Sequence, residues 1–108
     1  QPDDIGEAAE LVVMDVSFIS VAKVLPAVAA ASAPGSEFLI LIKPQFELEK
    51  REVGKGGIVR DPALHQKAID GVLAAAAEAR LDALGVRPSH LTGSEGNQEF
   101  FLHARRRG

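Results

Sequence analysis

Three ionisable side chains stand at the ends of predicted strands in this 108-residue sequence. Asp15 lies near the end of an apolar run, residues 11–16, and Lys43 directly follows a second run, residues 38–42. Glu99 begins the last predicted strand, which should run antiparallel to the others. Ligands of open α/β sheets bind outside the carboxyl ends of the strands. The sequence therefore predicts that these three side chains converge on one rim of a sheet.

Two interpretations of the acid and the lysine remain open at this point. The first is a structural ion pair at the edge of a sheet. The second is a functional lysine, Lys43, whose protonation is controlled by the neighbouring carboxylate of Asp15. The pattern of residues alone does not choose between them.

The first half of the chain predicts two strands separated by a helix. Neither apolar run alternates with polar residues, which favours strands buried on both faces, as in a parallel sheet. An alanine-rich helix is expected from Ser20, because alanine is the strongest helix former. Pro26 either kinks this helix or marks where its regular part begins. The sequence APGS, residues 33–36, should end it.

The second half predicts a long loop over residues 44–60, a helix and two strands. Asp61 is the expected N-cap of the helix, Pro62 its first residue, and the helix should extend to about Arg80. A weaker strand, residues 81–86, precedes the strand over residues 99–104. No helix separates these last two strands, so they should pair antiparallel. The order of elements indicates an α/β sheet, and a solvated tail is expected for residues 105–108.

Composition excludes several classes of protein. The formal charge is −3 and 46% of the residues are apolar, which suits one folded domain and argues against disorder. Without cysteine, disulfides and thiolate metal sites are excluded. No segment has the ~18 apolar residues of a membrane span, and the acidic start is unlike a basic signal peptide, so a cytoplasmic location is expected. The first residue is not Met, which suggests that sequence upstream is missing.

A basic stretch between the predicted second strand and second helix has two interpretations. Lys50, Arg51, Lys55 and Arg60 fall within residues 50–60, together with GKGG. A Walker-type phosphate loop is not indicated, because G-x-x-x-x-G-K-[ST] is missing. A flexible solvated loop is the simpler interpretation, although four bases this close would also suit the phosphates of a nucleic acid.

Histidine and serine give weaker signals. His65, His90 and His103 lack the spacing of metal ligands. Ser17 and Ser20 lack the G-x-S-x-G context of a hydrolase nucleophile, and helix capping explains Ser20 better.

Four sequence blocks together resemble the hemolysin A (TlyA) family of FtsJ-like ribosomal RNA ribose methyltransferases. They are DVSFIS from Asp15, IKPQFE ending at Glu47, VGKGGIVRDP from Val53 and TGSEGNQEFFLH from Thr92. The resemblance implies a Rossmann-like fold with three mostly parallel strands, a final antiparallel strand and two main helices. By this resemblance residues 1–108 form a single partial domain, the C-terminal half of the catalytic domain. The cofactor half and an S4-type RNA-binding domain would lie upstream.

The resemblance also implies roles for the rim residues. The family uses a Lys-Asp-Lys-Glu tetrad, in which Asp15, Lys43 and Glu99 match the last three members, and the first lysine would lie upstream. Lys43 would act as general base towards a ribose 2′-hydroxyl, or would orient it and stabilise developing negative charge. Asp15 and Glu99 would position the lysine and the ribose.

Cofactor and substrate contacts follow from the same resemblance. S-adenosylmethionine would be bound in part by Asp15, Val16, Ser17 and Phe18. Ribosomal RNA, alone or in a ribosomal subunit, would meet Lys55, Arg60 and Phe46. Core packing remains an equal alternative for Phe18 and Phe46.

Two other functional classes are weighed against the enzyme, namely a non-enzymatic interaction module and a membrane-active hemolysin. The second is disfavoured, since no membrane span or strongly basic amphipathic helix is present. Residues 11–16 would be an unpaired edge strand, which predicts a homo-oligomer. Alternatively, residues 1–10 fold over that edge and keep the chain monomeric.

Overall fold

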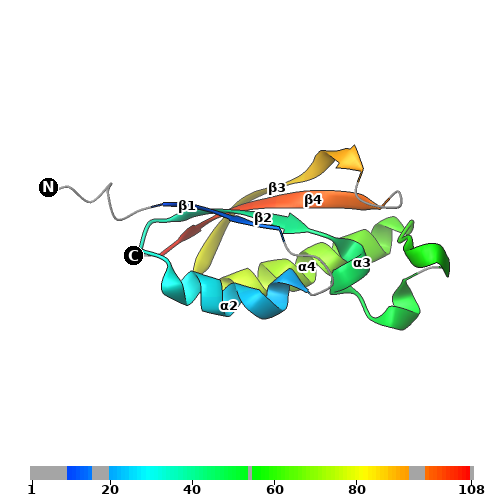
Figure 1. Ribbon diagram of the computed structural model, residues 1–108, viewed down its shortest axis with the longest axis horizontal. Helices are drawn as coiled ribbons and strands as arrows, with labels where there is room; N and C mark the ends of the chain where they lie inside the picture. The colour runs from blue at the N-terminus through cyan, green and yellow to red at the C-terminus, as the bar shows by residue number, and fades with distance from the viewer. Residues whose placement is uncertain (1–9, 16–19, 54, 93–96, 108) are drawn as a thin grey trace, which may run out of the picture.

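The computed structural model describes residues 10–15, 20–53, 55–92 and 97–107, and shows one sheet with helices on one face (Figure 1). The strands are β1 (Leu11–Met14), β2 (Glu37–Ile42), β3 (Leu81–Thr92) and β4 (Gln98–Arg106). The helices are α2 (Val21–Ala31), the single turn α3 (Pro44–Glu47) and α4 (Pro62–Glu78), with two 3-10 turns, η1 (Lys50–Glu52) and η2 (Lys55–Gly57).

The strand order is β1-β2-β4-β3. β1 pairs parallel with β2, and β4 runs antiparallel between β2 and β3. This confirms three strands in one direction, a final antiparallel strand and two main helices. The last strand in the sequence is thus inserted into the sheet, so that β4 lies directly beside β2 rather than at the edge.

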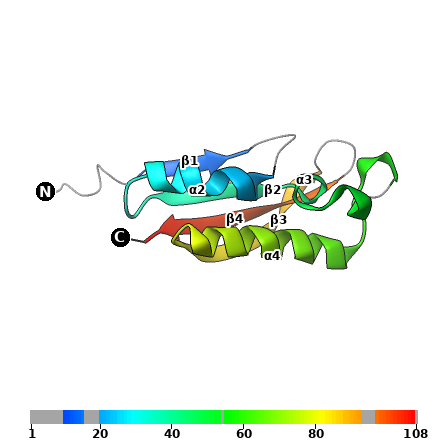
Figure 2. The same cartoon turned by 90° about the horizontal axis from the view of Figure 1, so that it is seen from below.

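The core lies between the sheet and helices α2 and α4, which run side by side beneath it (Figure 2). Helix α2 contributes Val21, Leu25 and Ala29 at a spacing of four residues, which places them on one face. Leu25 of α2 and Phe38 of β2 are fully buried. Burial of one such side chain stabilises the fold by about 2 kcal/mol.

The helix termini follow their capping residues. The hydroxyl of Ser20 accepts a hydrogen bond from Ala22 N–H at 3.1 Å, and Asp61 accepts one from Ala63 N–H at 2.9 Å. Both expected N-caps are confirmed. Helix α2 continues through Pro26, which is exposed, so the regular helix does not begin there.

Four expectations from the sequence were wrong in detail. β1 is not buried on both faces, because Leu11 and Val13 are 67% and 63% exposed. The described helices cover only one side of the sheet, which leaves these alternate residues open. Residues 44–60 are not a plain loop but contain α3 and both 3-10 turns, and β3 is twice as long as residues 81–86. In addition, the C-terminal arginines are not a solvated tail.

Those arginines stabilise the edge of the sheet where β4 ends and where β2 and β3 begin. Arg105 and Arg106 belong to β4, where the Arg106 guanidinium donates to the Ser32 carbonyl at the end of α2. Arg107 pairs with Asp82 at 2.6 Å. The partners lie far away in the sequence, so the arginines join β4 to its neighbours.

A pH-dependent contribution to stability is expected at Glu37. Its carboxylate accepts from His103 Nε2–H at 2.7 Å and from Arg105 at 3.3 Å, and these hydrogen bonds hold the pKa of Glu37 below its ordinary value of 4.5. A lowered pKa means that the ionised form stabilises the fold above pH 4.5, and that this contribution disappears as the pH falls through the folded-state pKa. Thermal unfolding should therefore show Glu37→Gln less stable than wild type at about pH 6, and the difference should shrink as the pH is lowered below 4.5. A difference that is constant with pH would contradict this.

Candidate functional site

The carboxyl ends of β1 and β2 carry the first two rim residues. Asp15 directly follows β1, and Lys43 directly follows β2 as the residue before α3. Lys43 Nζ lies 2.7 Å from Asp15 Oδ1, so the expected proximity is confirmed. The lysine side chain is 12% exposed, whereas the aspartate is 57% exposed. The ammonium is therefore held inside the rim, with its carboxylate partner on the solvent side.

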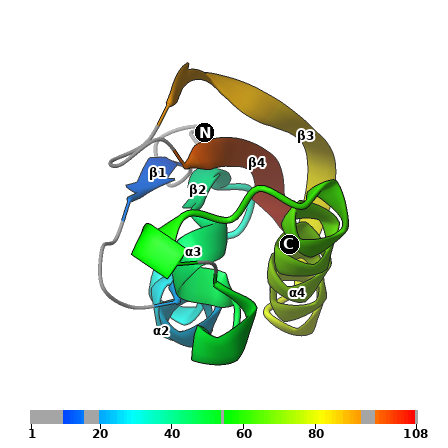
Figure 3. The ribbon, with the colours of Figure 1, turned by 90° about the vertical axis from the view of Figure 1, so that its right-hand side faces the viewer.

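Glu99 reaches the same rim from the opposite direction. The antiparallel register of β2 and β4 ends with Ile42 opposite Phe100. Lys43 and Glu99 are the next residues on their strands, so they occupy facing positions at the end of the ladder. Glu99 is half-buried. Figure 3 views this end of the molecule, where β1, β2 and β4 meet above α3.

The segment after β2 is tied to the start of α2 by Glu47. Its Oε2 accepts a hydrogen bond from Val21 N–H at 2.6 Å, and its Oε1 accepts one from the Ser20 hydroxyl. This contact went unnoticed in the sequence, although Glu47 ends the block IKPQFE. The only signal in the sequence was the presence of an acidic residue in that block.

The segment carrying GKGG is held by Asn97, a second residue that sequence reasoning missed. Asn97 is 2% exposed; its side chain accepts from Val59 N–H at 2.8 Å and donates to the Gly57 carbonyl at 2.8 Å. Gly56 and Gly57 have φ of 84° and 79°, a conformation that favours glycine. Asn97 thus fixes this turn, and Asn97 itself lies two residues before Glu99 in the sequence.

His65 completes this support from helix α4. Its Nε2 lies 2.8 Å from the Val59 carbonyl oxygen, and its ring meets that of Phe100 edge-on at 5.5 Å. His65 therefore packs and bonds within the fold. Among the described residues, no three potential metal ligands lie together.

Replacing Asn97 should destabilise the protein. Asn97→Ala removes two hydrogen bonds and leaves the N–H of the buried Val59 without its partner, while the carbonyl of the exposed Gly57 loses a part-buried bond. An unsatisfied buried group costs about 1–3 kcal/mol, so we expect a loss of about 2 kcal/mol in the free energy of unfolding. Urea titration measures it, and Gln66→Ala on the exposed face of α4 is the control, expected within about 0.5 kcal/mol of wild type. A loss as small as that of the control would show that Asn97 does not hold the turn.

The other predicted site residues lie near the rim or outside the described residues. Phe46 is half-buried in α3, Lys55 begins η2, and Arg60 is exposed between η2 and α4. Val16, Ser17 and Phe18, predicted to bind the cofactor, are outside the described residues. His90 lies in β3, and nothing is described of its side chain.

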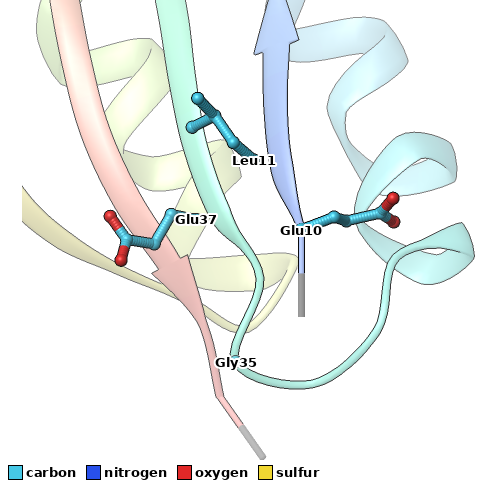
Figure 4. Close-up of a pocket in the computed structure, with 4 residues that line it drawn as sticks. All are labelled: Glu10, Leu11, Gly35 and Glu37. Carbon is cyan, nitrogen blue, oxygen red and sulfur yellow. The ribbon is translucent and has the colours of Figure 1, made fainter. Parts of the chain in front are cut away.

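Two cavities lie away from the rim. One, of about 310 Å³, is at the amino end of β1 and β2 and is lined by Glu10, Leu11, Gly35 and Glu37 (Figure 4). Its two carboxylates point to opposite sides, so they do not converge on a ligand. The other, of about 350 Å³, lies on the open face of the sheet between β2, β3 and β4. These two cavities and the rim residues Asp15, Lys43 and Glu99 therefore occupy different places.

The model of the FtsJ-like methyltransferase family matches residues 1–106. The chain belongs to the FtsJ-like methyltransferase family. Its relatives include the 16S/23S rRNA (cytidine-2′-O)-methyltransferase TlyA of Mycobacterium tuberculosis, 43% identical over 96% of this chain and 39% of the relative. Hemolysin A of Brachyspira hyodysenteriae is 34% identical over 90% of this chain and 40% of the relative.

Solved structures of other proteins share the fold of this chain. A provisionally named hemolysin from Lactococcus lactis superposes with a TM-score of 0.87 at 39% identity, covering 91% of this chain and 47% of that one. An S-adenosylmethionine-dependent methyltransferase from Methanosarcina mazei superposes with a TM-score of 0.58 at 16% identity, covering 90% and 58%, which shows the shared fold alone. The chain thus spans about two fifths of the curated relatives it matches. Within the described residues, no helix is long and apolar enough to cross a membrane.

Proposed function

We propose that this chain is the C-terminal part of the catalytic domain of an RNA methyltransferase that modifies a ribose 2′-hydroxyl of ribosomal RNA. The observation that carries the proposal is the Lys43–Asp15 ion pair at the carboxyl ends of β1 and β2, with Glu99 at the facing position of β4. The TlyA relative, which is named as a cytidine-2′-O-methyltransferase, supports the same substrate class. Modification of ribosomal RNA also favours a cytoplasmic location.

S-adenosylmethionine is the proposed methyl donor, and the described residues fit one side of its site. Asp15 offers an exposed carboxylate at the carboxyl end of β1, where open α/β sheets bind ligands. Val16, Ser17 and Phe18 follow it in the sequence and are proposed to extend the site. When bound, the cofactor would supply an electrophilic methyl group.

The three rim residues are proposed to remove the ribose hydroxyl proton or stabilise the developing negative charge, and to position the reacting groups. As the ribose oxygen bonds to the methyl carbon and the carbon–sulfur bond breaks, the hydroxyl proton must leave. Lys43 either accepts this proton in its neutral form or, as an ammonium, orients the hydroxyl and stabilises the developing negative charge. Asp15 holds the Lys43 side chain in place, and Glu99 is proposed to hold the ribose.

The RNA backbone is proposed to lie along the segment between α3 and α4. Lys50, Arg51 and Arg60 are exposed there, and Lys55 belongs to the turn that Asn97 fastens. Cationic side chains bind phosphates without reading sequence, so this segment would place the RNA rather than select the nucleotide. Phe46 of α3 is proposed to stack on a base at the rim.

Methyl transfer by the full-length protein tests the proposal. Ribosomal RNA or ribosomal subunits are incubated with S-adenosylmethionine that carries a labelled methyl group, and the RNA is then digested with alkali. A 2′-O-methyl group blocks the attack of that oxygen on the neighbouring phosphate, so the label should remain in an alkali-resistant dinucleotide. Label on a base, or no label in the RNA, would refute the proposal.

Self-association of the isolated 108-residue chain is proposed from the β1 edge. The described structure pairs β1 on one side only, with β2, and Leu11 and Val13 are exposed beside the free edge. An unpaired apolar edge is a template for another strand. Light scattering at tens of micromolar should therefore give the mass of a dimer or larger species, and Val13→Lys should shift the protein towards monomer. A wild-type mass of one chain would refute edge pairing.

A further inference from the structure

Glu47 joins the two segments that carry the rim residues. It comes four residues after Lys43, on the single turn α3. Its partners, Ser20 and Val21, come five and six residues after Asp15, at the start of α2. One carboxylate therefore connects the chain that leaves β1 with the chain that leaves β2.

The chemistry of this contact is favourable on both sides. Helix α2 has no acidic residue in its own first turn, and its amino end carries partial positive charge from the helix dipole. The Glu47 carboxylate supplies the missing negative charge from another element and accepts from both the N–H of Val21 and the hydroxyl of Ser20. Hydrogen bonds to a charged acceptor are about twice as strong as neutral ones.

Helix α3 depends on such a contact for its orientation. A helix of four residues is too short to be stable by itself, so tertiary contacts must hold it. Lys43 is the residue before this turn, and the buried Pro44 is its first residue. The direction in which Lys43 leaves the backbone is therefore linked to the placement of α3.

We propose that Glu47 is a positioning residue for methyl transfer, which holds Lys43 against Asp15 by fastening α3 to the amino end of α2. This inference rests on the proposed function. Asp15 is largely exposed and follows an edge strand, so the 2.7 Å separation of the pair depends on how the two segments are fixed relative to each other. A displacement of about 1 Å at a reacting centre can lower a rate about a hundredfold.

Two substitutions separate the parts of the contact. Glu47→Gln keeps the size of the side chain but removes the charge, and its amide NH₂ cannot accept from a donor. Ser20→Ala removes the hydroxyl partner of Glu47 and, with it, the N-cap hydrogen bond from Ala22 N–H. Glu78→Gln removes an exposed carboxylate at the far end of α4 and is the charge-matched control.

The full-length protein is assayed with ribosomal RNA, beside wild type and Lys43→Ala. For Glu47→Gln we expect kcat to fall at least about tenfold, with the KM for RNA within about twofold and an unchanged number of cofactor sites per protein in calorimetry. Combining it with Ser20→Ala should add little, because both act through one contact. Glu78→Gln should match wild type. A normal kcat for Glu47→Gln, or a loss accounted for by fewer cofactor sites, would overturn the inference.

A crystal structure of Glu47→Gln gives a readout that does not depend on activity. We expect Lys43 Nζ and Asp15 Oδ1 to move beyond the distance of an ion pair, and an unchanged pair would overturn the inference. The proposed function fails separately, if wild type transfers no methyl group to ribose. If wild type is active, Lys43→Ala inactive and Glu47→Gln normal, the proposed function stands and only the role of Glu47 is refuted.

Discussion

Lys43→Ala is expected to lower methyl transfer by the full-length protein about a hundredfold or more, while the affinity for S-adenosylmethionine stays near that of wild type. The lysine is nearly enclosed and paired with Asp15 at 2.7 Å, in a place where a charge or a proton acceptor would face the ribose. A group that acts mainly in the transition state affects turnover more than ground-state binding. Loss of one such electrostatic group costs about 2.7 kcal/mol or more, which corresponds to the hundredfold effect.

Single-turnover methylation and calorimetry with the cofactor measure the two quantities. Lys23→Ala is the matched control, because Lys23 is an exposed lysine on α2, away from the ion pair. It should keep both turnover and affinity within about twofold of wild type. Near-normal turnover in Lys43→Ala would show that the ion pair only supports the structure, which is the first of the two interpretations that the sequence leaves open.

The directions of the strands could be predicted because they depend on local signals, whereas the place of β4 between β2 and β3 was not predicted. A helix between the first two apolar runs requires a parallel pair, and the direct succession of the last two strands requires an antiparallel one. The ends of those strands then place Asp15, Lys43 and Glu99 at one rim without any knowledge of side-chain contacts. The apolar runs do not reveal how many faces of the sheet the helices cover. Leu11 and Val13 were therefore predicted to be buried, but they are exposed.

The supports of the rim could not be predicted, since they are polar contacts between distant positions. Glu47 bonds to Val21, 26 residues away, and Asn97 to Val59, 38 residues away. No periodicity marks such partners, and an isolated Glu or Asn in a loop is ordinarily solvated. The short turns α3 and η2 were missed for the same reason, because those distant side chains, rather than helix propensity, hold them in place.

The second large effect concerns the 108-residue chain by itself, which is expected neither to bind S-adenosylmethionine tightly nor to methylate RNA. The sequence contains no G-x-G-x-x-G turn, the feature that brings backbone close to a nucleotide-like cofactor in such sheets. Among the described residues, the carboxyl end of β1 offers Asp15, and the next strand position beside it is unpaired. If the isolated chain supplies only one side of the cofactor site, it makes only part of the contacts with the cofactor. Those contacts are needed to offset the entropy that the cofactor loses on binding.

Calorimetry with the isolated chain should show a Kd for S-adenosylmethionine weaker than about 1 mM, a binding free energy of only about −4 kcal/mol. The full-length protein, measured under the same conditions, is the control and should bind at micromolar concentrations. Circular dichroism of the isolated chain must show folded α/β structure, so that weak binding is not the result of an unfolded protein. If the folded chain bound the cofactor with a micromolar Kd, the residues after β1 would form a sufficient site, and the division of the cofactor site between two halves of the domain would be refuted.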